Sequence, residues 1–183
     1  MQEQAISGFR LAPQQEALWP LVRRAGNGAA YRAQAEVRLE GALDRDALSR
    51  ALRRAVGRHE VLRTGFPLLP GLAAPLQVIA DDAPPAVRTV DLSGRPEDER
   101  AAALAELFAA ELAAPIDLGT PPLLRATVAV LSPSEHRLLL ALPAFVADAA
   151  GLANLVAEIA RAYAAETGEG APEDDAVQYV DLA

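Results

Sequence analysis

Few residues of this 183-residue chain could transfer a proton, since it has only two histidines and no cysteine. His59 stands where a predicted helix meets a predicted strand, and His136 begins a strand after a turn. Neither is spaced from a serine as in a nucleophile–base pair, and no His, Asp or Glu spacing is typical of a metal-ligand set. We interpret His59 as a junction residue that bonds the local backbone and His136 as an exposed hairpin residue. We expect no metal site.

The segment 142–149, with the sequence LPAFVADA, lies between an aliphatic strand and a predicted helix. A strand, a tight corner and a capped helix often present catalytic side chains at a cleft, yet this corner offers no group that moves a proton. Asp148 is expected to be the N-cap of the helix. Because a carboxylate beside an apolar loop is costly to bury unless it is paired, we also expect Asp148 to form a structural ion pair with Arg58 or Arg63.

The elements that must position this loop alternate along the chain. The hydrophobic periodicity and the capping residues predict four helices and six strands. The helices are expected at residues 13–24, 45–57 (with Asp44 as N-cap), 96–114 and 149–165, and the strands at 31–39, 62–66, 76–79, 87–92, 123–131 and 136–142. Because hairpins and crossovers are both present, the fold class expected is an α/β (α+β) sandwich with a mixed sheet flanked by helices.

Composition limits the class of protein further. Apolar residues form 51% of the chain but aromatic ones only 4%, so the core must consist of Leu, Ala and Val. The net charge of -8 argues against a nucleic-acid partner, which selects basic surfaces. No apolar run is long enough to span a membrane and the first residues do not resemble a signal peptide, so we expect a cytoplasmic protein without a membrane partner.

The sequence RHEVLRTGF at residues 58–66 resembles the pattern RHExLRTxF of condensation domains of nonribosomal peptide synthetases. Two weaker resemblances agree with it in order and spacing: the segment 12–19 is similar to the opening motif of the family, and the segment 179–183 to the start of a later one. The positions that match are Gln15, Trp19, Arg58, His59, Glu60, Leu62, Arg63, Thr64, Phe66, Tyr179 and Asp181.

The resemblance places the catalytic HHxxxDG motif of the family on residues 143–149. Pro143 and Ala144 replace the two histidines, Asp148 is retained, and Ala149 replaces the glycine. The related heterocyclisation domains carry an aspartate where this chain has Pro143, so that chemistry is not implied either. In the family the retained aspartate is held to form a salt bridge with the first arginine of the RHE segment, which here implies an Asp148–Arg58 pair. The resemblance thus implies a preserved scaffold without a catalytic residue.

By the same resemblance, residues 1–183 form the N-terminal lobe, similar to chloramphenicol acetyltransferase, of a two-lobed condensation domain whose second lobe is absent. The partners implied are acyl or peptidyl carrier proteins, which bring their own phosphopantetheine, and the C-terminal lobe; no cofactor is expected to bind directly. Two alternatives stay open: an acyltransferase, active once completed by its second lobe, that relies on positioning without the histidine, and a scaffold that forms a homodimer through its exposed face.

Overall fold

The computed structural model describes residues 8–25 and 31–168. At its centre lies a four-stranded sheet in the order β1-β6-β5-β4. The strands are β1 (Arg32–Glu40), β4 (Val87–Asp91), β5 (Arg125–Ser132) and β6 (Glu135–Pro143). β6 is antiparallel to both β1 and β5, whereas β4 runs parallel to β5. The predicted mixed sheet is confirmed.

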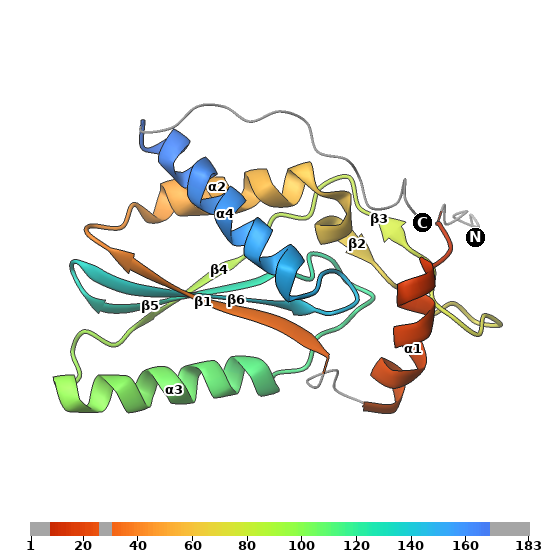
Figure 1. Ribbon diagram of the computed structural model, residues 1–183, viewed down its shortest axis with the longest axis horizontal. Helices are drawn as coiled ribbons and strands as arrows, with labels where there is room; N and C mark the ends of the chain where they lie inside the picture. Colours follow the sequence, from red (N-terminus) through yellow and green to blue (C-terminus); the bar gives the residue numbers. More distant parts are fainter. Residues whose placement is uncertain (1–7, 26–30, 169–183) are drawn as a thin grey trace, which may run out of the picture.

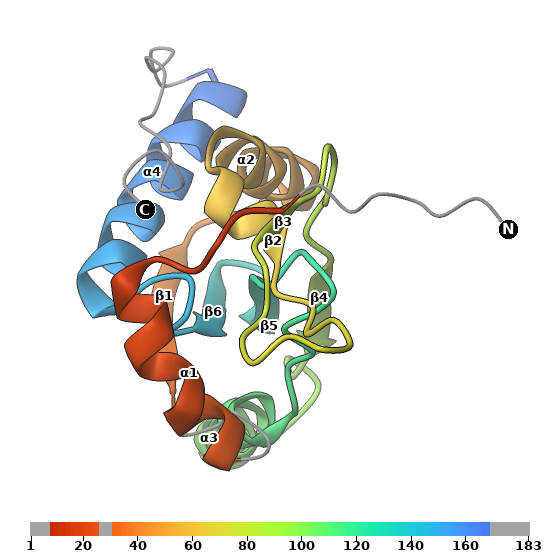
Figure 2. The same ribbon diagram turned by 90° about the vertical axis from the view of Figure 1, so that its right-hand side faces the viewer.

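Helices cover both faces of this sheet (Figure 1). α2 (Arg45–Arg58) and α4 (Ala149–Glu166) lie side by side over the upper face, and α3 (Glu97–Ala113) lies beneath the lower face. α1 (Pro13–Ala25) stands across one end of the sheet, in front of the other elements in Figure 2. The α/β sandwich is therefore confirmed. None of the helices in the described ranges is both long and apolar enough to cross a membrane.

Both helices of the upper layer begin at the aspartates expected from the sequence. Asp44 caps α2 by accepting a hydrogen bond from the amide of Ala47 at 2.9 Å. Asp148 caps α4 in the same way, accepting from the amide of Gly151 at 2.8 Å. Each carboxylate satisfies a first-turn N–H and lies at the positive end of the helix dipole. The two caps thereby fix where the helices start relative to the strands before them.

The main core lies between the upper face of the sheet and the helices α2 and α4. Its largest fully buried members are aliphatic, among them Leu52 of α2, Leu140 and Leu142 of β6, and Leu152 of α4. A smaller cluster beneath the sheet joins α3 to β5 through Ala103, Ala129 and Leu131, together with Leu92. Burial of these side chains is the chief favourable contribution to folding. Leucine, alanine and valine dominate the core, as expected.

Two local expectations are wrong. After α2 the chain does not become extended at once, because residues Glu60–Arg63 form a 3-10 turn, η1, before the short strands β2 (Thr64–Gly65) and β3 (Val78–Ile79) pair. His136 is not an exposed hairpin residue but is only 4% exposed. The alternation of β6 sets His136 on the same face as Leu138 and Leu140, which pack in the main core.

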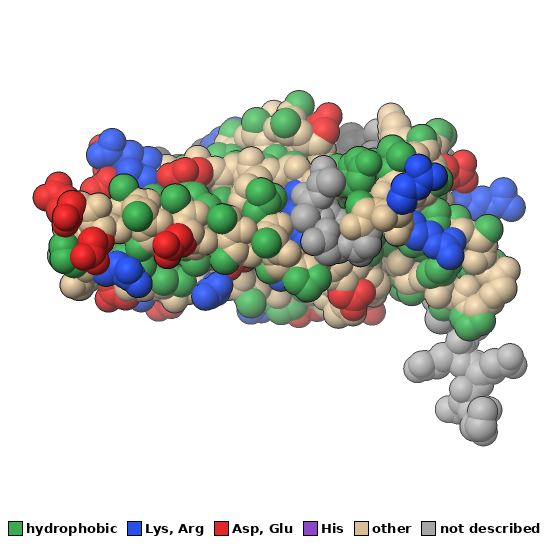
Figure 3. Space-filling model, turned by 90° about the horizontal axis from the view of Figure 1, so that it is seen from below, with side chains coloured by type: hydrophobic (Ala, Val, Ile, Leu, Met, Phe, Trp, Pro, Cys, Tyr) green, Lys and Arg blue, Asp and Glu red, His purple; other side chains and the backbone are tan. Residues whose placement is uncertain are grey.

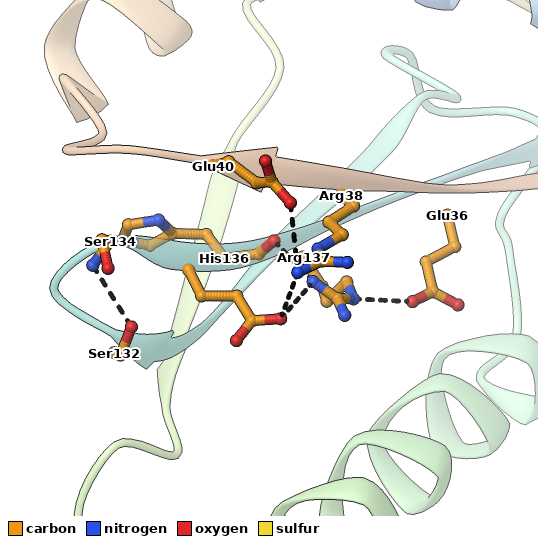
Figure 4. Close-up of polar contacts among 8 residues, drawn as sticks. Glu36, Arg38, Glu40, Ser132, Ser134, His136 and Arg137 are labelled. Atoms are coloured by element: carbon orange, nitrogen blue, oxygen red, sulfur yellow. Dashed lines mark hydrogen bonds and ion pairs between the residues drawn. The ribbon is translucent and has the colours of Figure 1, made fainter.

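The part of the lower face near β1 carries charged side chains (Figure 4). Arg137 lies 3.2 Å from Glu36 and 3.0 Å from Glu135, and Arg38 lies 3.1 Å from Glu40 and 3.6 Å from Glu135. The pairs of Arg38 are exposed and contribute little to stability. Charges on an edge strand do, however, oppose pairing with another strand, and β1 is at the edge of the sheet.

Candidate functional site

The loop that joins β6 to α4 is held by a buried glutamine of α1. Gln15 is 2% exposed, and its Nε2 donates a hydrogen bond to the carbonyl oxygen of Phe145 at 3.0 Å. Its Oε1 accepts from the amide of Ala12 at 2.9 Å. Because both polar atoms of the amide are used, Gln15 can be buried without an unsatisfied group. Gln15 of α1 therefore contacts the β6–α4 loop directly.

The ring of Phe145 connects the same loop to two further motif residues. It meets Phe66 edge to face, with ring centroids 4.7 Å apart and planes at 89°. It also meets Trp19, with centroids 6.2 Å apart and planes at 65°. Trp19 is fixed in turn by a hydrogen bond from its Nε1 to the carbonyl oxygen of Ala73 at 3.2 Å. Two segments far from this loop in the sequence thus converge on the side chain of Phe145.

The backbone of the loop is tightly turned. The amide of Val146 donates to the carbonyl oxygen of Pro143 at 2.9 Å, and the amide of Ala144 donates to that of Tyr31 at 2.9 Å. The side chains at the start of this turn are a ring without a donor at Pro143 and a methyl group at Ala144. Neither can act as a general base, which needs a titratable group within hydrogen-bond reach of the reacting proton.

Side chains of the RHE segment (residues 58–66) stabilise the turn that this segment forms. Arg63 donates from Nη1 to the carbonyl oxygen of Ala80 at 2.5 Å and from Nη2 to Oε1 of Glu60 at 3.1 Å. The hydroxyl of Thr64 donates to the carbonyl oxygen of Glu60 at 2.7 Å. Leu62 is buried in the main core. These contacts explain why this sequence follows α2 with a 3-10 turn and then with the strand that carries Phe66 into the core.

The structure corrects the expected ion pair between Asp148 and Arg58. The carboxylate of Glu158, in the middle of α4, meets Arg58, with Nε and Oε1 3.3 Å apart. Asp148 is exposed, and its carboxylate bonds Gly151 of its own helix. An exposed carboxylate in water needs no cation to offset its burial, so the physical argument for the Asp148–Arg58 pair does not apply here.

The same glutamate corrects the interpretation of His59. Nε2 of the imidazole lies 2.6 Å from Oε2 of Glu158, so His59 bonds a side chain of α4 and not the local backbone. Sequence analysis missed Glu158. Its signal was a carboxylate on the apolar side of the last helix, one residue before Ile159 and three after Leu155, where a charge requires partners.

The remaining expectations concern metal ligands, Ala149 and the last two motif residues. Within residues 8–25 and 31–168, no group of three or more His, Asp or Glu side chains could hold a metal ion. Ala149 is the first residue of α4. Tyr179 and Asp181 lie outside the described residues.

Comparison with known proteins shows the family. The profile of the family described as "Condensation domain" matches residues 7–183. Phosphinothricin tripeptide synthetase PhsB of Streptomyces viridochromogenes is 41% identical over 159 residues, which are 87% of this chain. Tyrocidine synthase 3 of Brevibacillus parabrevis is 33% identical over 161 residues, or 86% of the chain. The chain spans only 13% of the first of these synthetases and 2% of the second.

Solved structures agree in fold. The first condensation domain of the calcium-dependent antibiotic synthetase, in complex with a substrate analogue, superposes with a TM-score of 0.77 at 28% identity over 93% of this chain. The starter condensation domain of rhizomide synthetase RzmA superposes with a TM-score of 0.82 at 20% identity over 96% of the chain, which shows the fold alone. The chain covers 40% and 44% of these two structures, and it corresponds to their N-terminal portion.

Proposed function

This chain belongs to the condensation-domain family of nonribosomal peptide synthetases, and we propose that it is a lobe that docks carrier proteins without supplying acid–base catalysis. The products of such synthetases are peptide natural products. In this proposal residues 1–183 act with a C-terminal lobe, and the substrates arrive as phosphopantetheine thioesters on carrier proteins. The lobe itself holds no cofactor.

One observation carries the proposal. The β6–α4 loop is held in place by Gln15 and Trp19 from α1 and by Phe66 from the RHE segment. The side chains at the two histidine positions are nevertheless Pro143 and Ala144. A loop that is held in place but lacks a proton-transfer group suits docking without the acid–base assistance that typically contributes about 10²–10⁴-fold to a rate.

Charge supports the docking role. Arg23 and Arg24 are exposed in the last turn of α1, while the exposed first turn of α3 is acidic (Figure 3). Arginine binds phosphate groups well because its planar guanidinium matches their oxygens. The phosphodiester of a phosphopantetheine arm would be drawn to the α1 end of the molecule and repelled from the start of α3.

Exposed apolar side chains lie in segments next to α1. Phe9 is 50% exposed, and Leu68 and Leu72 are 44% and 43% exposed. Phe9 pairs with Gln77, which follows the loop that carries both leucines, and Ala73 of that loop bonds Trp19. Apolar side chains that gather on a surface mark places where a partner binds. We assign this surface to contacts with the carrier protein and the second lobe.

The proposal is tested by titrating a phosphopantetheine-bearing carrier protein of the same synthetase into the complete protein and measuring the heat of binding. We expect saturable binding that is weakened severalfold when Arg23 and Arg24 are both changed to Glu. The matched control changes Arg53 and Arg54, which are exposed on α2, to Glu. Absence of binding by the complete protein, or equal weakening by both double variants, would refute the docking role.

A further inference from the structure

Two arginines and a threonine gather on the lower face of the sheet, where β4 and β5 begin. Because Val128 of β5 packs in the main core on the upper face, the alternation of the strand places Arg125 and Thr127 on the lower face. Arg88 of β4 is in register with Thr127, so the two side chains are neighbours on that face. Arg125 reaches the end of α3, where its Nη1 donates to the carbonyl oxygen of Ala114 at 3.2 Å. These side chains therefore lie opposite the C-terminus of α3.

A cavity of about 440 Å³ lies between these strands and the end of α3. The polar residues that line it are Arg88, Arg125, Thr127 and Glu111 of α3. The rest of its lining is apolar and consists of Pro84, Ala86, Ala114, Pro122, Leu124 and Ala126. Small-molecule sites are typically hollows of about 300–1,000 Å³ with mostly apolar walls and a few polar groups that converge. The cavity thus has the size and the lining of a small-molecule site.

The charges around the cavity favour an anion. The carboxylate of Glu111, a residue that is 8% exposed, lies 2.6 Å from Nη1 of Arg88 and is compensated by it. The half-buried Arg125 has no ion pair with any described carboxylate. Its guanidinium is always charged. Burial, and after it the charge of Arg125, lower the pKa of Arg32, so a second guanidinium experiences that positive charge.

Thr127 gives an independent reason to expect a ligand. The residue is 3% exposed, and its hydroxyl has no hydrogen-bond partner among the described residues. Buried hydroxyls are nearly always hydrogen-bonded, because an unpaired one costs free energy. A hydroxyl can donate to an anion as a guanidinium can. Since Arg125 and Thr127 are two residues apart on one face of β5, a single anion can accept from both.

We propose that this cavity binds a small organic carboxylate, whose oxygens accept hydrogen bonds from the guanidinium of Arg125 and the hydroxyl of Thr127. A monoanion matches the charge of Arg125. Inorganic phosphate carries more than one negative charge at neutral pH and would leave part of it uncompensated beside Glu111. The apolar lining suits a short hydrocarbon tail. None of the lining residues belongs to the surface assigned to carrier docking, so the two proposals can fail separately.

The test is a calorimetric titration of the 183-residue chain with three probes at low ionic strength. 3-Methylbutanoate is the carboxylate, 3-methylbutanamide has the same shape without the charge, and inorganic phosphate is an anion without the tail. We expect saturable binding of the carboxylate, with the amide at least about tenfold weaker, because hydrogen bonds to a charged group are the stronger ones. Phosphate should also bind more weakly than the carboxylate. Equal affinity for carboxylate and amide, tighter binding of phosphate, or no saturable binding would overturn the proposal.

Three variants assign the binding to this cavity. Arg125→Gln removes the cation and should bind carboxylate and amide equally weakly. Thr127→Val keeps the branched shape without the hydroxyl, and it should weaken carboxylate binding severalfold without lowering the free energy of unfolding, which a merely structural role would not produce. Arg53→Gln, which removes an exposed cation of α2, is the control and should bind like the parent. An equal loss in Arg53→Gln, or unchanged binding by Thr127→Val, would contradict the site. The comparison of probes needs only the parent, so it decides the matter even if Arg125→Gln does not fold.

Discussion

The ring of Phe145 joins the β6–α4 loop to two other aromatic side chains, and replacing it with leucine should loosen that loop. The ring is 2% exposed and lies against the rings of both Phe66 and Trp19. Leucine keeps an apolar group in the same space but makes neither edge-to-face contact. The substitution Phe145→Leu therefore isolates the aromatic contacts from the simple burial of a hydrophobic side chain.

The magnitude follows from the two ring pairs. Each edge-to-face pair contributes about 0.5–1.5 kcal/mol beyond burial, so Phe145→Leu should lower the free energy of unfolding by about 1–3 kcal/mol. Phe145→Ala also opens a cavity, and the cost should rise to about 3–5 kcal/mol. The Phe66 pair should dominate, since its centroids are 4.7 Å apart and those of the Trp19 pair are 6.2 Å apart.

Urea denaturation of the 183-residue chain measures these values, and Trp19, the only tryptophan, reports on the packing of α1 through its fluorescence. A double-mutant cycle of Phe66→Leu and Phe145→Leu should give a coupling energy of about 0.5–1.5 kcal/mol. Phe108→Leu is the control, because Phe108 is half-buried on α3 and has no ring pair among the described residues. A coupling energy near zero would refute the reasoning.

Three further expectations concern stability. Gln15→Leu leaves the carbonyl of Phe145 buried without its donor and should cost about 2–4 kcal/mol in urea denaturation; a cost below 1 kcal/mol would contradict the role of Gln15. Gly65→Ala sets a Cβ 2.8 Å from the carbonyl oxygen of Gly119, so we expect a loss of about 1–3 kcal/mol and a lower melting temperature, and an unchanged one would speak against this close approach. Burial, and to a lesser extent the charge of Arg45, lower the pKa of His136 from its ordinary 6.5. Below about pH 6.5 the unfolded chain therefore takes up a proton that the folded chain resists, and stability should fall as the pH falls. His136→Leu should make the free energy of unfolding less dependent on pH between about pH 5 and 7. A pH dependence equal to that of the parent would exclude His136 as its source.

The parts of the fold that sequence could predict are those set by local physics. The carboxylates of Asp44 and Asp148 cap the two helices of the upper layer because a first-turn N–H lies within reach of either side chain. The alternation of β1 and the aliphatic run of β6 indicated the strands, and the short turn between β5 and β6 indicated their antiparallel pairing. Each of these predictions follows from residues close together in the sequence and requires no knowledge of which elements pack against each other.

Apart from the 3-10 turn at Glu60–Arg63, the errors concern contacts between distant segments. Asp148 caps α4 and Glu158 lies within it, and only the packing of α2 against α4 decides that Arg58 meets Glu158. His136 could be placed on either face of β6 until the face covered by the helices was known. Likewise, the motif residues Gln15 and Phe66 were identified from their pattern, but their convergence on Phe145 follows from the tertiary structure alone.

We propose that this lobe keeps the scaffold of a condensation domain but lacks the group that would assist peptide-bond formation. A single-turnover condensation assay tests this most directly, with the complete protein, a donor carrier and an acceptor carrier, each loaded as its thioester. With both carriers bound, we expect dipeptide to form no faster than in a mixture of the two loaded carriers alone. Product formation well above that background would contradict the account, because it would mean that the loop with Pro143 and Ala144 supports catalysis.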